Sequence, residues 1–220
     1  MITPTDPDYQ QTKARLKKRT PLEPIFAELA AWVAARFGVT PVDFWYDLHM
    51  PDRTPRLEII VRTDDEDTTL TEGEWRMSAA RQAEVAQAFA DLVAKHGLQA
   101  KYQTQSLFVY PGVFDDVARK EANESVSEKD IGALKRKLKN PELWEIVKQF
   151  DTVTFFFFTK EQAERNKTNG LLEKYAAAWG KLAAKHDDFG LFAQRGVTTY
   201  FDSKEVFDNE YGGNWYHYFK

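Results

Sequence analysis

Histidine side chains can act as acids, bases or metal ligands. The chain has four histidines: His49, His96, His186 and His217. His96 and His186 each follow a lysine at the end of related segments, 90–96 and 180–186, and could form paired acid–base or metal-binding groups. A Lys-His pair in a last helical turn also suits the negative end of the helix dipole and caps free carbonyl groups. We favour capping. No HxH, HExxH or HxxxH spacing occurs, so we expect no metal site.

Other catalytic motifs are missing from the sequence. The chain has no cysteine, which excludes disulfides, thiolate metal sites and a cysteine nucleophile. It has no GxSxG, SxxK, phosphate-binding P-loop or GxGxxG pattern. Pro51-Asp52 and Glu58 match part of a nuclease motif, but Ile59-Ile60 stand where a lysine is needed. We therefore lean towards a protein that is not an enzyme, and we expect no cofactor.

Acidic and aromatic residues indicate a binding surface. An acidic run covers 64–67, and the stretch 200–219 mixes aromatic residues with acids and asparagine around Gly212-Gly213. Trp and Tyr are frequent at the centres of protein interfaces because they bury a large area and keep a polar atom. The same stretch could instead be a final strand that completes the core. The candidate partner-binding residues are Asp64, Asp65, Asp202, Glu205, Tyr211, Asn214, Trp215 and Tyr216.

Hydrophobic periodicity and Pro or Gly boundaries predict the elements that must position these residues. Ser127 is the expected N-cap of one helix. The phenylalanine run 155–158 predicts a strand buried on both faces, or one with its second face at an interface. The expected helices are 22–38, 77–96, 127–139, 141–149 and 170–186. The expected strands are 42–50, 56–63, 99–104, 106–110, 152–159, 191–194, 197–201 and 214–219.

Several segments repeat along the chain. The helix faces at 85–92 and 175–182 match at a shift of 90 residues, and the strands 57–63 and 153–159 match at a shift of 96. The segments 113–116 and 206–209 also match. The order of elements predicts an α+β fold of two pseudo-repeated modules, with mainly antiparallel or mixed sheets and helices packed on the sheet face. We expect a polar basic arm at 1–20, a first repeat at 21–118 and a second at 119–220, or one continuous domain.

Composition limits the class of protein. Hydrophobic residues make up 43% and charged residues 29% of the 220 positions, which is typical of globular chains. A net charge of −4 and a pI near 5.7 give no attraction to nucleic acid or to an anionic membrane. No apolar run is long enough to span a bilayer, and from the polar residues at 1–11 we expect no secretory signal. We expect a soluble, cytoplasmic protein.

This acidic, cysteine-free α+β chain resembles the immunity proteins of bacterial toxin systems. The resemblance lies in the helix at 24–37, the hairpin at 43–63 and the endings rich in aromatic and acidic residues. The resemblance implies a non-enzymatic protein-binding module, with an inhibitor of a basic toxin as one form of it. It specifies no residue. The alternative is a small-molecule-binding or enzymatic domain with a site in a cleft between the repeats, where His96, His186 and the tyrosines are candidates. Pairing of two copies through the 155–158 strand is a third possibility.

Overall fold

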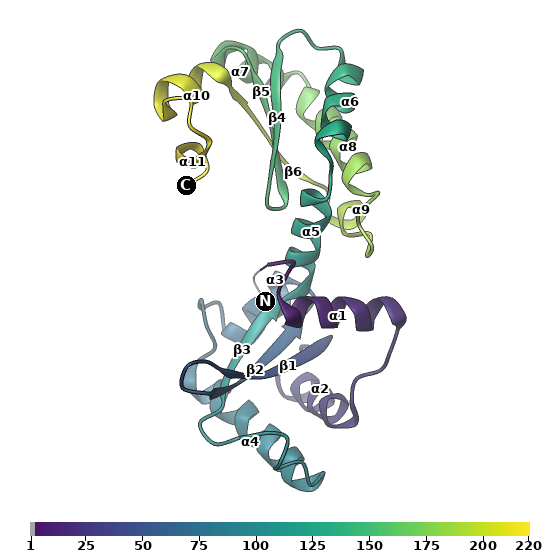
Figure 1. Ribbon diagram of the computed structural model, residues 1–220, viewed down its shortest axis with the longest axis vertical. Coiled ribbons are helices and arrows are strands. Elements are labelled where there is room, and N and C mark those ends of the chain that lie inside the picture. Colours follow the sequence, from purple (N-terminus) through teal and green to yellow (C-terminus); the bar gives the residue numbers. More distant parts are fainter. Residues whose placement is uncertain (1–2) are drawn as a thin grey trace. The chain divides into compact units, whose positions relative to one another are not determined.

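The computed structural model describes residues 3–220, so the first two residues of the predicted basic arm lie outside the described residues. The chain divides into two compact units, unit 1 at 1–117 and unit 2 at 118–220 (Figure 1). The division falls inside helix α5 (Phe114–Glu124). Each unit has its own three-stranded sheet with helices packed on it, which confirms the predicted α+β class.

Unit 1 contains a mixed sheet in the order β1-β2-β3. β1 runs antiparallel to β2, and β2 runs parallel to β3. The connection between the two parallel strands contains α3 and α4, because parallel neighbours need a long crossover. The elements are α1 (Pro7–Lys18), α2 (Pro24–Phe37), β1 (Asp43–His49), β2 (Thr54–Val61), α3 (Asp64–Thr71), α4 (Ala79–Lys95) and β3 (Phe108–Val113).

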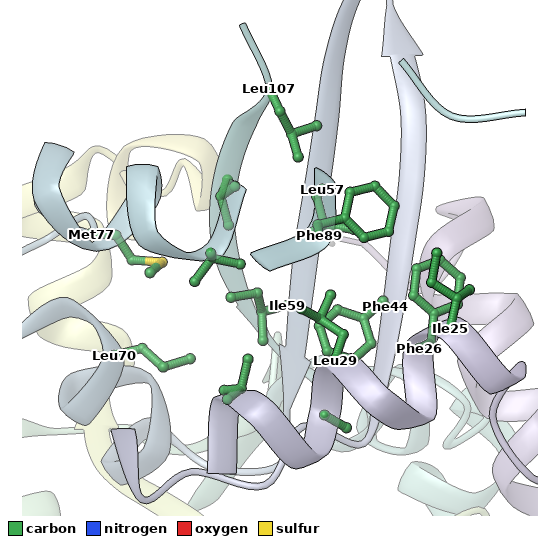
Figure 2. Close-up of a cluster of buried hydrophobic side chains, with 14 of the residues drawn as sticks. Ile25, Phe26, Leu29, Phe44, Leu57, Ile59, Leu70, Met77, Phe89 and Leu107 are labelled. Atoms are coloured by element: carbon green, nitrogen blue, oxygen red, sulfur yellow. The ribbon is translucent and has the colours of Figure 1, made fainter. Parts of the chain in front are cut away.

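The core of unit 1 lies on one face of this sheet (Figure 2). Leu57 and Ile59 alternate along β2 towards the helices, as the two-residue period of a strand requires. Leu29 of α2 and Phe89 of α4 meet them, and all four side chains are fully buried. We call this the core face, and the opposite side of each sheet the outer face.

Helix α1 covers part of the outer face of unit 1. It accounts for most of the segment that sequence reasoning treated as a polar arm, and Asp8, Tyr9 and Thr12 are buried in it. The Tyr9 ring stacks on Phe114 with centroids 5.4 Å apart. The basic residues of the segment include Arg15, whose guanidinium pairs with Asp43 of β1 at 2.7 Å.

Unit 2 builds a sheet of the same kind, in the order β4-β5-β6. β4 runs antiparallel to β5, and β5 runs parallel to β6. The elements are α6 (Glu128–Leu138), β4 (Leu143–Gln149), β5 (Thr152–Phe157), α7 (Lys160–Thr168), α8 (Leu171–Ala183), α9 (Leu191–Arg195), β6 (Thr198–Ser203), α10 (Lys204–Tyr211) and α11 (Trp215–Tyr218). Ser127 is the N-cap of α6, as predicted.

The phenylalanine run serves both faces of this sheet. Phe155 and Phe157 belong to the core of unit 2, where Phe155 meets Tyr175 of α8 at 4.9 Å between ring centroids. Phe156 points to the outer face and is also fully buried, whereas Phe158 is 45% exposed beyond the strand end. A strand buried on both faces, one of the two predicted alternatives, is therefore present.

Four predicted elements differ from the structure. Residues 141–149, expected as a helix after Pro141, form strand β4 from Leu143 onward. Residues 191–194 and 214–219, expected as strands, belong to the short helices α9 and α11. Residues 99–101 form a turn and residues 102–104 have no regular secondary structure, so no strand is present there. In the tail, the Asn214 side chain caps a helix start after two glycines in left-handed conformation, and this local chemistry prevails over the strand preference of the aromatic residues.

The two units share one pattern of strand pairing, an antiparallel pair followed by a parallel pair. In the parallel pairs Glu58 lies opposite Tyr110 and Thr154 lies opposite Tyr200, which reproduces the shifts of 96 and 90 residues. The third match does not hold, because Val113 ends β3 whereas Val206 lies inside α10. Origin by duplication stays a prediction.

Candidate functional site

Six of the eight predicted partner-binding residues lie in the last two elements of unit 2 and the strand before them. β6 ends at Ser203, whose hydroxyl accepts a backbone hydrogen bond and begins α10. Gly212 ends α10 in left-handed conformation, and the Asn214 side chain then accepts from the Tyr216 N–H at 2.9 Å and begins α11. These caps turn the tail so that Trp215 packs on the outer face of the sheet.

An aromatic cluster results on this face. The Trp215 ring stacks on Phe207 with centroids 4.0 Å apart and on Trp144 of β4 at 5.9 Å. Tyr218 meets Phe156 of β5 edge-on at 5.1 Å. We call these five residues the C-terminal aromatic cluster. Aromatic contacts of this geometry contribute about 0.5–1.5 kcal/mol each beyond area burial, so the cluster anchors a tail that has only one short helix.

Three of the predicted residues help to hold this arrangement. The Tyr218 hydroxyl donates to Asp202, and burial together with this hydrogen bond raises the pKa of Tyr218. The Glu205 carboxylate accepts from the backbone N–H of Lys160 at 2.9 Å, at the start of α7. The Tyr211 ring packs edge-on against Tyr218 at 4.9 Å. These three side chains therefore make contacts within unit 2 that help to hold the tail in place.

A groove of about 430 Å³ adjoins the cluster along β4. Trp144, Ile146, Trp215 and Phe219 give it apolar walls, and Glu128, Glu145 and Lys148 bring charge to it. Trp215 is 36% exposed and Tyr216, next to it in α11, is 70% exposed. Rings that are large, held in place and open to solvent are the kind of surface that binds other proteins.

Asp64 and Asp65 belong to unit 1, apart in the sequence from the other six. The acidic run 64–67 is the first turn of α3. Thr63 and Glu66 form a capping box around it, with the Glu66 carboxylate accepting from the Thr63 N–H at 3.1 Å. Asp64 and Asp65 are exposed beside the positive end of the helix dipole.

The two related histidines have different surroundings. His96 follows α4, and its Nε2 lies 2.9 Å from Glu28 of α2, which Lys95 also contacts at 2.5 Å. The hydrogen bond from Lys95 is the main cause that lowers the pKa of Glu28. His186 is exposed, two residues beyond the C-cap of α8. His96 thus links two helices through its side chain.

The outer face of unit 1 contains a cavity of about 510 Å³ that sequence reasoning missed. The cavity is lined by side chains from all three strands, namely Trp45 and Asp47 of β1, Arg56 of β2 and Tyr110 of β3. Residues 6–8 at the start of α1 complete the lining. These residues alternate with core residues along each strand and so share the outer face. That alternation was visible in the sequence, but the cover supplied by α1 was not.

Glu58 lies on the same face of β2 and is fully buried. Burial, followed by a hydrogen bond with Asp8 of α1, raises the pKa of Glu58 to about 8. At neutral pH the Glu58 carboxyl is therefore protonated, and it donates to the Asp8 carboxylate. Gly112 of β3 lies against this carboxyl so closely that a Cβ there would overlap Glu58 Oε1, so the strand needs glycine at that position.

Two further groups shape the cavity. Arg56 holds Asp47 through two hydrogen bonds, of 2.9 and 2.6 Å, and so lowers the pKa of Asp47. The guanidinium also lies over the Tyr110 ring, 5.8 Å from its centroid. Burial raises the pKa of the Tyr110 hydroxyl, with the Glu58 carboxyl contributing in the same direction. Tyr110 therefore stays a neutral hydrogen-bonding group at physiological pH.

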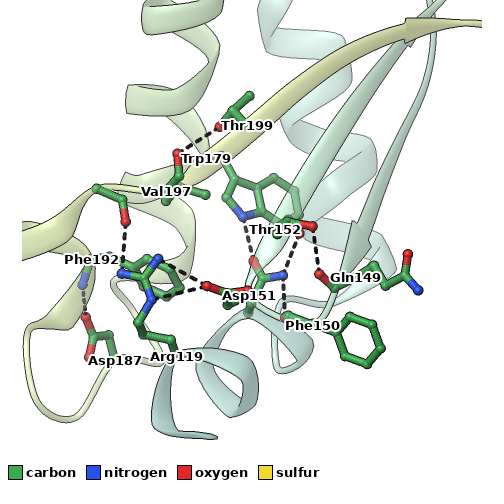
Figure 3. A network of polar contacts seen from close by, with 12 residues as sticks. Arg119, Gln149, Phe150, Asp151, Thr152, Trp179, Asp187, Phe192, Val197 and Thr199 are labelled. Atoms are coloured by element: carbon green, nitrogen blue, oxygen red, sulfur yellow. Dashed lines mark hydrogen bonds and ion pairs between the residues drawn. The ribbon is translucent and has the colours of Figure 1, made fainter. Parts of the chain in front are cut away.

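A buried polar network in unit 2 has a structural role (Figure 3). The Asn123 amide donates to the carbonyl groups of Phe150 and Thr152 at 2.9 Å each, and its oxygen accepts from the Trp179 indole N–H at 2.8 Å. Arg119 donates to the Gly196 carbonyl at 3.2 Å. All of these polar groups are satisfied within the unit, so the network fixes α5 against the β4–β5 turn.

Within residues 3–220, no group of three or more His, Asp or Glu side chains could hold a metal ion. No helix in the described part of the chain is long and apolar enough to cross a membrane. We found no match to this chain among models of protein families, curated proteins or solved structures.

Proposed function

We propose that the protein is a non-enzymatic binding module that holds a protein partner on the C-terminal aromatic cluster and the adjoining groove. The observation that carries the proposal is the pair of adjacent exposed rings, Trp215 and Tyr216, fixed on a helix beside a groove with apolar walls. Rigid aromatic side chains lose little conformational freedom on binding, which is why they dominate binding energy at interfaces.

The partner is basic. The segment 202–210 contains four acids, Asp202, Glu205, Asp208 and Glu210, against one base, Lys204. Lys204 pairs with Asp208, so the segment carries a net charge of −3 from the other three acids. Complementary charge of this kind speeds association and orients the partner. An immunity-type inhibitor of a basic bacterial toxin, acting in the cytoplasm, is a concrete form of the proposal. Asp64 and Asp65 remain candidate contacts on unit 1.

Affinity capture followed by measured binding tests the proposal. We expect the tagged chain to capture a basic protein in a stoichiometric complex, and Tyr216→Ala to weaken the purified complex at least tenfold. Tyr216 is chosen because its 70% exposure lets it change without loss of core packing. Trp75→Ala removes an even more exposed ring, at 82% exposure, from unit 1 and should leave affinity unchanged.

A basic partner also predicts that affinity falls as salt concentration rises. Capture of no stoichiometric partner, or equal affinities for the Tyr216→Ala variant and the unaltered chain, would overturn the proposed surface. Light scattering on the free protein distinguishes a second copy of the chain from a different protein as the occupant.

A further inference from the structure

We propose that the outer-face cavity of unit 1 is a binding site for a small organic cation that carries a guanidinium or ammonium group. The site belongs to unit 1 and does not depend on the proposed protein-binding surface of unit 2. Its volume of about 510 Å³ lies in the ordinary range of small-molecule pockets, roughly 300–1,000 Å³.

The walls of the cavity favour a cation. Trp45, Phe108 and Tyr110 present aromatic rings, whose faces attract a positive charge within about 6 Å. Phe108 is 44% exposed, so one side of the cavity opens to solvent and admits a ligand. The rings also offer an apolar surface for the carbon chain of the ligand.

The charges of the cavity point the same way. Among residues 3–220, the cavity is lined by three carboxylates, from Asp6, Asp8 and Asp47, and by Arg56, which donates two hydrogen bonds to Asp47. An anionic ligand would lie beside these carboxylates, whereas a guanidinium could donate hydrogen bonds to them and stack on the Trp45 ring. A metal ion is a poorer fit, because these side chains do not converge as a group that could coordinate one.

A comparison with unit 2 shows that the sheet forms without a buried carboxyl group on its outer face. By strand register, Thr154 stands where Glu58 does and Asp202 stands where Gly112 does. The outer face of unit 2 is filled by the rings of Phe156 and Tyr218. A buried carboxyl group costs folding free energy, and unit 2 completes the same sheet without one at that position. Perturbed carboxyl groups beside a cavity are typical of binding and catalytic sites.

NMR titration of the full chain with n-butylguanidinium tests the proposal, with n-butanol and n-butyrate as uncharged and anionic comparisons. We expect saturable shifts of the Trp45 indole signal by n-butylguanidinium, with a dissociation constant of about 1 mM or lower, and at least tenfold weaker binding of the other two. Trp45→Leu should reduce the affinity at least tenfold. Trp75→Leu, which removes an exposed ring of the same unit outside the cavity, should leave the affinity unchanged.

A pH series gives a second, independent readout. Glu58 faces Asp8, Tyr110 and Arg56, and its own pKa of about 8 lies between pH 7 and 9. The affinity for n-butylguanidinium should rise over this range and stay constant in the Glu58→Gln variant, since guanidinium keeps its charge. Equal binding of all three probes, absence of saturable binding, or unchanged affinity in both Trp45→Leu and Tyr110→Phe would overturn the site.

Discussion

At the residue scale, the buried Glu58 carboxyl ties the stability of unit 1 to pH. The folded protein keeps this proton up to about pH 8, whereas the unfolded chain releases it near the ordinary pKa of 4.5. The stabilising contribution is therefore complete below pH 4.5, declines as pH rises to about 8 and is constant above it. The decline is about 1.4 kcal/mol per pH unit, because protonation differs by one proton between the two states.

We predict that Glu58→Gln removes this slope, because the amide is neutral at every pH and can still donate to Asp8. The measurement is the free energy of unfolding in urea from pH 5 to 8 for both proteins, with the difference between them plotted against pH. Amide exchange in unit 2 supplies an internal control and should respond equally in both proteins. A pH-independent difference would show that Glu58 is ionised in the folded state.

The burial of Glu58 beside this cavity could not be predicted from the sequence. Leu57-Glu58-Ile59 shows the two-residue alternation that correctly predicts a strand with Glu58 pointing away from the core. Such an acid is ordinarily solvated. Its burial depends on contact with α1, some fifty residues earlier, and the basic residues of that segment gave it the character of a solvated arm. Arg119 and Asn123 in α5 are hidden for the same reason, since their partners come from distant turns.

At the element scale, capping chemistry decides which segments become helices. Both units place a capping box directly after the middle strand, Thr63 with Glu66 and Thr159 with Gln162. The Thr-x-x-Glu/Gln spacing is visible in the sequence and would have predicted α3 and α7. Hydrophobic periodicity alone predicts no helix over the acidic run 64–67. The strand at 143–149 was missed because Pro141 favours a helix start, although Trp144, Ile146 and Val147 have high strand propensity.

We predict that Thr63→Ala and Thr159→Ala each lower the free energy of unfolding by about 1 kcal/mol, the usual cost of a lost N-cap. Each change leaves backbone N–H groups of the first turn without their side-chain acceptor. Thermal or urea unfolding measures the loss. Thr68→Ala, an exposed position inside α3, serves as control and should not destabilise the protein. Equal effects of Thr63→Ala and Thr68→Ala would contradict a capping role.

At the scale of the whole molecule, the sequence predicted more of the architecture than of the function. The α+β class and the mixed strand pairing follow from local periodicity, which each strand and helix carries in its own residues. Candidate sites depend on which faces are covered, and sequence periodicity does not show that. The outer faces of the two sheets differ in this respect. Unit 1 has Glu58 beside a cavity, whereas unit 2 has aromatic rings packed on the same face of its sheet.

The separate cores of the two units lead to a prediction about cooperativity. The buried clusters that contain Leu57 in unit 1 and Phe155 in unit 2 share no residue. Leu57→Ala leaves a cavity in a fully buried site and should cost about 2–5 kcal/mol, and Phe155→Ala about 3–5 kcal/mol. Because each cluster packs only on its own sheet, we expect each change to accelerate amide hydrogen exchange in the core strands of its own unit while the other unit keeps its protection. Each variant is the control for the other. If Leu57→Ala accelerated exchange equally in β2 and β5, the two units would unfold as one cooperative body.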